Sequence, residues 1–267
     1  MPMPKVRLVT PTRRNTSSIA AFEDELLNHF GWGEDIDFDV HAANDDLSKL
    51  STLVTDAVKA PVPNVIVSAG LMATNLLQAA TSASLIPVIQ AAGGGPSTTA
   101  QSNITGFTLN SLATANNLLT KFASGRTVTV LYNDYNTTSS YVYSHLAPPP
   151  GVTLTGLPIH DPALLVRPAG AIDGFIVIPD AMLYKYHRKV VAMVERKAAQ
   201  TCYPERQFKN AHEDKGNVKV YGSHVPATFR LAASYVNFIL NGGTVAQIVA
   251  QNGGVRFPNA VADNDPP

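Results

Sequence analysis

The chain has 267 residues, 45% of them hydrophobic, and its 20 lysines and arginines balance 20 aspartates and glutamates. This length allows one large domain or two modest ones with real cores, and the neutral balance argues against nucleic acid or an anionic membrane surface as a partner. The single cysteine, Cys202, excludes an internal disulfide and any multi-cysteine metal site. No apolar run reaches the roughly 20 residues of a membrane-spanning helix, so we expect no membrane insertion.

The first half of the chain is predicted to alternate between strands and helices. Its apolar runs are rich in valine and isoleucine and lack polar alternation, which favours a parallel sheet covered on both faces. A strand, helix and strand within residues 64–96 form the clearest unit of this kind. The expected elements are strand 6–10, helix 19–30, strand 36–41, helix 47–59, strand 65–67, helix 71–82 and strand 86–90.

The second half repeats this order. The expected elements are helix 114–123, strand 127–132, a helix, strand 152–157, a short helix, strand 175–178, helix 181–197, strand 201–203, strand 218–222 and helix 227–240, with a surface strand in the tail after residue 254. Two copies of one series predict an α/β protein of two doubly wound, three-layer lobes with mainly parallel sheets and a ligand cleft between them. We assign residues 1–104 and 223–242 to the first lobe and residues 105–222 and 243–267 to the second.

Candidate ligand contacts lie where the strands end, because open parallel sheets bind ligands beyond their carboxyl edges. Small backbone-exposing turns in the first lobe suit an anionic group, and the Asp180 carboxylate in the second suits a cationic one. That pairing indicates an amino acid or a similar zwitterion. Asp180 can equally be the N-cap of the following helix, and asparagine and aspartate are ordinary turn residues. The predicted contacts are Thr10, Thr12, Ser68, Ala69, Gly70, Ala91, Ala92, Asn133, Tyr135, Asn136, Asp180 and Tyr203.

Two stretches that could suggest a cofactor are better explained structurally. Asp45 and Asp46 precede a helix, as capping residues do, and no further oxygen ligands follow at the spacing of a calcium loop. The glycines at 93–95 lack the lysine and hydroxyl residue that end a P-loop, and they follow the wrong strand for a dinucleotide fingerprint. We therefore predict neither a metal nor a cofactor, and we interpret the glycines as a flexible crossing between lobes.

Five segments carry a family resemblance: NITGFT (103–108), TVTVLYND (127–134), IVIPDA (176–181), TCYPE (201–205) and VKVYGSHVPATFRLAASYVNFILNGG (218–243). They resemble successive landmarks of the ABC transporter substrate-binding proteins related to tryptophan and aromatic amino-acid binding components. The resemblance implies a type I periplasmic-binding-protein fold, the return of helix 227–240 to the first lobe, and closure of the lobes by a hinge.

The resemblance also bears on particular residues. It matches Asp180 to the aspartate of a ligand-contacting turn, in which Ala181 replaces an asparagine, and the turn from Ser68 to Gly70 to one that receives a ligand carboxylate. The ending FPNAVADNDPP departs from the family pattern, and the first strand begins almost at Met1 without an export signal. We therefore expect a periplasmic or cell-envelope protein whose signal was trimmed, or else a cytoplasmic one.

These features together predict a solute-binding protein for an ABC importer rather than an enzyme. Its expected partners are a small-molecule ligand and an ABC permease, and it is expected to be a monomer or weak dimer. One alternative is a cytoplasmic small-molecule sensor. The other is a two-lobed isomerase-type enzyme, although a single cysteine excludes the two-thiol version and no Gly-x-Ser-x-Gly nucleophile elbow occurs.

Overall fold

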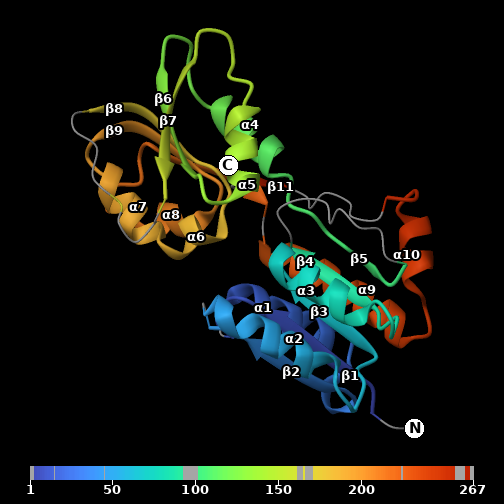
Figure 1. Ribbon diagram of the computed structural model, residues 1–267. Helices are drawn as coiled ribbons and strands as arrows, with labels where there is room; N and C mark the ends of the chain where they lie inside the picture. Colours follow the sequence, from blue (N-terminus) through green and yellow to red (C-terminus); the bar gives the residue numbers. More distant parts are fainter. Residues whose placement is uncertain are drawn as a thin grey trace. The chain divides into compact units, whose positions relative to one another are not determined.

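The computed structural model describes residues 3–14, 16–44, 46–92, 102–160, 165, 171–223, 225–255 and 262–264. The chain divides into two compact units (Figure 1). The first unit comprises Met1–Leu109 and Val225–Ala260, and the second comprises Asn110–His224 and Val261–Pro267. Within the described part, no helix is both long and apolar enough to cross a lipid bilayer.

The first unit is built on a parallel sheet in the order β2-β1-β3-β4-β5. Its central strands are buried on both faces, as continuous valine and isoleucine runs predict. The strands are β1 (Lys5–Thr10), β2 (Asp37–Ala42), β3 (Val65–Ala69), β4 (Val88–Ala92) and β5 (Ile104–Gly106).

Helices cover both faces of this sheet. On one face, α1 and α9 enclose a core around Phe22, Phe229 and Val236; on the other, α2 and α3 pack around Leu50 and Leu77. The helical segments are α1 (Ser17–Glu23), η1 (Asp24–His29), η2 (Gly33–Asp35), η3 (Leu47–Lys49), α2 (Leu50–Val58), α3 (Leu71–Thr81), α9 (Val225–Leu240) and α10 (Val245–Gln251).

The second unit has a sheet in the order β11-β10-β9-β8-β6-β7. Its pairs are parallel except for β10 with β11, where the tail returns as an antiparallel strand. The strands are β6 (Thr127–Asn133), β7 (Thr153–Ile159), β8 (Ile172–Val177), β9 (Ala198–Tyr203), β10 (Val218–Ser223) and β11 (Ala262–Asn264).

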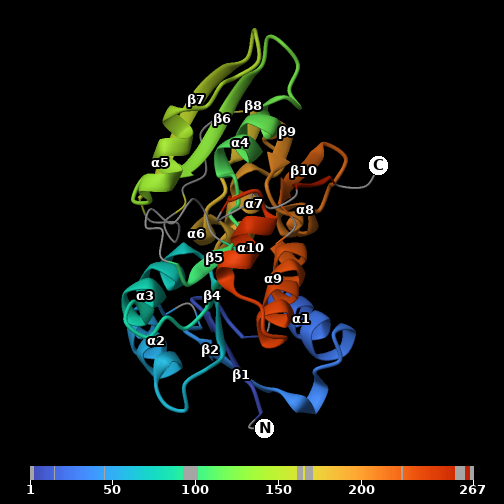
Figure 2. The same ribbon diagram turned by 90° about the vertical axis from the view of Figure 1, so that its right-hand side faces the viewer.

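The helices of the second unit also form two layers (Figure 2). One core, lined by α4 and α5, contains Phe122, Val142 and Cys202, and burial raises the pKa of the Cys202 thiol to about 11. The opposite core, lined by α6, α7 and α8, contains Val190 and Phe208. These helices are α4 (Ser111–Leu119), α5 (Thr137–Ser144), α6 (Ala181–Lys185), α7 (His187–Val194) and α8 (Arg206–Ala211).

The observed architecture is the predicted α/β fold with two three-layer units, and α9 returns to pack on α1 and β4, as the family resemblance implies. The predicted boundaries need three corrections. Residues 105–109 belong to the first unit because β5 pairs with β4, and residues 243–255 belong there because α10 packs against β5. The second sheet keeps β10 through Ser223, so the return to the first unit begins at Val225.

One predicted helix is interrupted. Instead of a single helix over residues 181–197, α6 ends at Lys185, α7 begins at His187, and β9 starts at Ala198. The predicted crossing at residues 93–95 and the short helix after the seventh strand fall outside the described residues.

Candidate functional site

Seven predicted contacts of the first unit gather at one edge of its sheet. Strands β1, β3 and β4 are adjacent and parallel, so their ends at Thr10, Ala69 and Ala92 share the carboxyl edge. Thr10 is buried, and its hydroxyl shares a 2.8 Å hydrogen bond with the hydroxyl of the exposed Thr12. It also accepts the Thr12 backbone N–H at 3.1 Å, so this pair fixes the turn after β1.

The small-residue turn after β3 exposes backbone rather than side chains. Ser68 is buried, and its hydroxyl shares a 2.7 Å hydrogen bond with that of Thr74 on α3. Ala69 and Gly70 are partly exposed, and Gly70 has φ +98°, a conformation that favours glycine. No side chain caps α3, so the first amides of this 11-residue helix face the same edge as the turn. Next to it on β4, Ala91 and Ala92 are buried.

A buried glutamine on β4 is a neighbour of this turn that the sequence reading overlooked. Gln90 stands opposite Ser68, and its side-chain amide donates a 2.8 Å hydrogen bond to the carbonyl of Phe107. Among the described residues its Oε1 has no hydrogen-bond partner. The sequence analysis predicts this strand from its apolar residues, so it gave no indication that Gln90 makes a polar contact.

In the second unit, Asp180 joins two loops. The residue is 5% exposed, and its Oδ1 accepts the backbone N–H groups of Met182 at 2.8 Å and Leu183 at 3.1 Å, capping α6. Its Oδ2 accepts the Asn136 side-chain amide at 2.7 Å, while the Asn133 amide lies 3.4 Å away. The predicted residues Asn133, Asn136 and Asp180 are therefore brought together, with Asp180 as their common acceptor.

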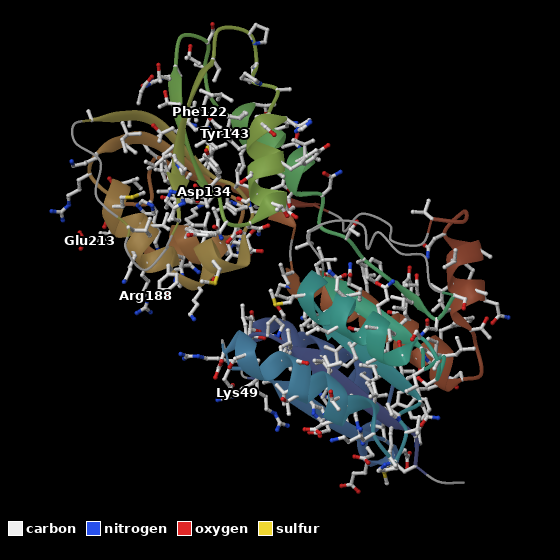
Figure 3. All side chains as sticks on the ribbon, in the orientation of Figure 1. Lys49, Phe122, Asp134, Tyr143, Arg188 and Glu213 are labelled. Carbon is white, nitrogen blue, oxygen red and sulfur yellow. The ribbon has the colours of Figure 1, made fainter. Side chains whose placement is uncertain are left out.

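The turn after β6 also presents an exposed aromatic side chain. Tyr135 is 78% exposed and lies edge-on to the His160 ring at 5.5 Å. His160 Nδ1 is in turn 2.8 Å from the Asp134 carboxylate, which Figure 3 shows near the strand ends. The sequence reading assigned no role to His160, although it follows the carboxyl end of β7, next to β6 in the sheet.

Tyr203 does not take the predicted role. It has no exposed surface, it stacks on Phe208 with ring centroids 4.9 Å apart, and its hydroxyl shares a 2.9 Å hydrogen bond with His212 Nε2. Burial raises the pKa of the Tyr203 hydroxyl, so it stays protonated at neutral pH. The position at a strand end was right, but the side chain turns into the core.

Two residues further on, Glu205 supplies a carboxylate that the sequence reading missed. It is partly buried, it makes no side-chain cap for α8, and burial raises its pKa to about 8. The pKa of the Tyr184 hydroxyl is raised well above its usual value, chiefly by burial and then by the nearby charges of Glu205 and Asp180. These two carboxylates therefore lie around Tyr184, after the neighbouring strands β8 and β9. Its position in the sequence could have indicated Glu205: like Asp180, it is an acidic residue shortly after a buried strand.

Metal ligation has no support within the described part of the chain, where no group of three or more histidine, cysteine, aspartate or glutamate side chains could hold an ion. Asp46 caps η3 through the Ser48 N–H at 3.2 Å. Asp45 lies outside the described residues.

No protein-family model and no curated protein matches this sequence. Solved structures do match its fold. A conserved domain protein from Vibrio cholerae has a TM-score of 0.72 at 16% identity, covering 97% of this chain and 90% of that one. An ABC domain from Streptococcus pneumonia in complex with L-Trp has a TM-score of 0.70 at 14% identity, with the same coverage. The periplasmic component of an ABC-type sugar transport system from Hahella chejuensis has a TM-score of 0.68 at 10% identity, covering 99% of this chain and all of that one.

The chain has the type I periplasmic-binding-protein fold. The resemblance read from the sequence is therefore supported at the level of the fold. The tryptophan-related subfamily is not singled out, since a protein solved with L-Trp and a component for sugars match at nearly equal TM-scores.

Proposed function

We propose that this protein is the solute-binding component of an ABC importer and captures a small polar or zwitterionic molecule between two hinged lobes. The observation that carries the proposal is that predicted contacts in each unit lie at the carboxyl edge of its parallel strands. The fold is shared over nearly the whole chain with a protein named as the periplasmic component of an ABC-type sugar transport system. We further propose a cell-envelope location, an ABC permease as partner, and a monomer or weak dimer in solution.

The chemistry of the two edges supports an amino-acid-like ligand. In the first unit, the turn at Ala69 and Gly70 and the uncapped start of α3 offer N–H groups to a carboxylate. In the second unit, the Asp180 carboxylate offers negative charge to an ammonium group, Glu205 offers a carboxyl group that a bound cation would ionise, and Tyr135 offers exposed aromatic area. Glu205 is the stronger candidate for the ammonium, because the Asp180 oxygens already accept several protein donors.

The ligand itself can be sought directly. Native mass spectrometry of freshly purified protein should find a co-purified small molecule, and thermal-shift screening of the 20 amino acids against simple sugars should raise the melting temperature only with the preferred class. A screen in which sugars stabilise the protein and no amino acid does would contradict the zwitterion proposal while leaving solute binding intact. Failure of every small solute to bind would overturn both.

Replacement of the carboxylates tests their assignment. Glu205→Gln should weaken binding of the selected amino acid by about 1.5 to 3 kcal/mol, the usual value of a hydrogen bond to a charged group, or roughly tenfold to 100-fold in Kd by calorimetry. Asp180→Asn should weaken binding less and lower the melting temperature more, because it disturbs the cap of α6 and the contact with Asn136.

A matched control separates the site from a general charge effect. Glu34→Gln changes an exposed carboxylate in η2 of the first unit and should leave the affinity unchanged. Equal affinity of Glu205→Gln and unaltered protein would remove Glu205 from the site, and the same result for Asp180→Asn would remove Asp180.

A further inference from the structure

The helical layer formed by α6, α7 and α8 carries lysine and arginine but no acidic residue. Helix α7 packs against both α6 and α8, so the outward-facing residues of the three helices share one side of the second unit. None of these helices contains an aspartate or a glutamate, whereas α4 and α5, in the opposite layer, contain no charged residue of either sign. We call the lysines and arginines of α6, α7 and α8 the basic surface: Lys185, Arg188, Lys189, Arg206 and Lys209.

An aromatic ring lies among the lysines of the basic surface. Tyr186, at the junction of α6 and α7, is partly exposed, and the Nζ atoms of Lys185 and Lys189 lie 5.7 Å and 5.4 Å from its ring centroid. Arg188 is exposed, and Figure 3 shows it at the margin of the second unit. Within the described part of the chain, neither Lys185 nor Arg188 forms an ion pair with a carboxylate. Because tyrosine and arginine are enriched at protein–protein interfaces, this exposed helix face is suited to a protein partner.

The first unit carries the complementary charge. Residues 15–48 include nine of the chain's 20 acidic residues and no lysine or arginine. Segments η1 and η2 pack against each other, which brings acids from both to one side of the unit. Among the described residues, four of these acids form no ion pair, and we call them the acidic surface: Glu23, Asp24, Glu34 and Asp35.

The acidic surface has an aromatic neighbour as well. Trp32 precedes η2, it is partly exposed, and its indole Nε1 donates a 2.8 Å hydrogen bond to Asn237 of α9, which holds the ring in place. The chain runs from the carboxyl end of β1 through α1 to the start of the parallel strand β2, so η2 lies at the amino end of β2 and away from the carboxyl edge. No residue of either surface is a predicted solute contact.

We propose that two copies of this chain associate, with the acidic surface of one copy against the basic surface of the other. Carboxylates of Asp24 and Asp35 face Lys185 and Arg188, and Trp32 lies near Tyr186 at the centre of the contact. A second copy is the partner that fits these charges, since a chain of zero net charge carries both surfaces. Exposed charge pairs are individually weak and screened by salt, so the association is weak and depends on ionic strength.

Sedimentation equilibrium of the unaltered full-length protein tests the association independently of solute binding. The weight-average mass should rise with protein concentration at about 20 mM salt, and the Kd should increase roughly tenfold or more at about 300 mM salt, where screening is much stronger. A dimer or a longer chain of copies supports the contact equally, because each copy offers both surfaces. A monomer at every concentration in low salt, or association that strengthens with salt, would overturn the proposal.

Charge reversal tests which residues are used. Lys185→Glu combined with Arg188→Glu should raise the Kd at least tenfold, and so should Asp24→Lys combined with Asp35→Lys. An equimolar mixture of these two double variants should associate again, because the first offers two acidic surfaces and the second offers two basic ones. Absence of association in the mixture would contradict a contact between copies.

A matched control separates this contact from the effect of net charge. Lys121→Glu combined with Lys219→Glu makes the same charge change in the second unit, but Lys121 follows α4, and Lys219 points to the opposite side of the sheet from Val218. Its Kd should stay within about threefold of that of the unaltered protein. Circular dichroism and melting temperature verify folding of every variant. Equal weakening in the control and in Lys185→Glu combined with Arg188→Glu would sink the assignment, as would monomeric protein that binds phosphatidylglycerol vesicles.

Discussion

At the residue scale, Glu205 has surroundings that disfavour the charged form of its carboxyl group. Burial raises its pKa from 4.5 to about 8, so the folded protein holds a proton there that the unfolded chain releases above pH 4.5. The free energy of unfolding should therefore fall as the pH rises from about 4.5 to about 8. Glu205→Gln should remove this contribution and stabilise the protein at pH 8.5 by roughly 1 to 3 kcal/mol.

Urea unfolding of both proteins at pH 5 and pH 8.5 measures this difference, with Glu34→Gln as the exposed control. If Glu205→Gln and unaltered protein lose the same stability between the two pH values, burial does not raise the pKa of Glu205 in the folded protein. A bound ammonium would lower the pKa of Glu205, so ligand should flatten the same pH dependence.

The positions of these residues could be predicted from the sequence, but their orientations could not. Acidic and amide side chains after buried strands pointed to the cluster of Asn133, Asn136 and Asp180, because parallel strands end at one edge. Tyr203 ends strand β9 and Glu205 lies two residues further on, and only packing decides which of them faces the core. The sequence reading chose the aromatic ring, whereas the structure buries that ring against Phe208.

At the element scale, strand and helix positions followed from hydrophobic periodicity, and the errors arose where pairing is non-local. The three-residue strand β5 is too short for its hydrophobic pattern to indicate which strand it pairs with. Its pairing with β4 is therefore seen only in the structure. The end of α6 at Lys185 was missed for a related reason: the apolar pattern continues through the break into α7.

Close contact between β4 and β5 depends on one glycine. Gly106 has φ +140°, and a Cβ there would lie 2.1 Å from the carbonyl oxygen of Gln90. Gly106→Ala should cost more than about 2 kcal/mol, because both backbone strain and a backbone clash oppose it. Gly31→Ala is the matched control: its φ is +73° but no atom lies within 4 Å, so about 1 kcal/mol is expected. Chemical denaturation would contradict this account if the two variants lost equal stability.

At the scale of the whole molecule, each unit has its own cores on both faces of its own sheet, so each has its own stability. A solute held by both units, as proposed, must stabilise both, whereas a solute held by one unit stabilises that one alone. At 100 times its Kd, the solute should add about 2.7 kcal/mol to the free energy of unfolding. Hydrogen exchange should show this as slower exchange of core amides in β3 and in β8 alike.

A variant in the second unit tests whether both units hold the same solute. Glu205→Gln should reduce the ligand-induced protection of β3 in the first unit, because a solute held by both units loses affinity for both at once. Protection confined to one unit would leave a small-molecule site standing but would remove the two-lobed capture that the proposed transport function requires.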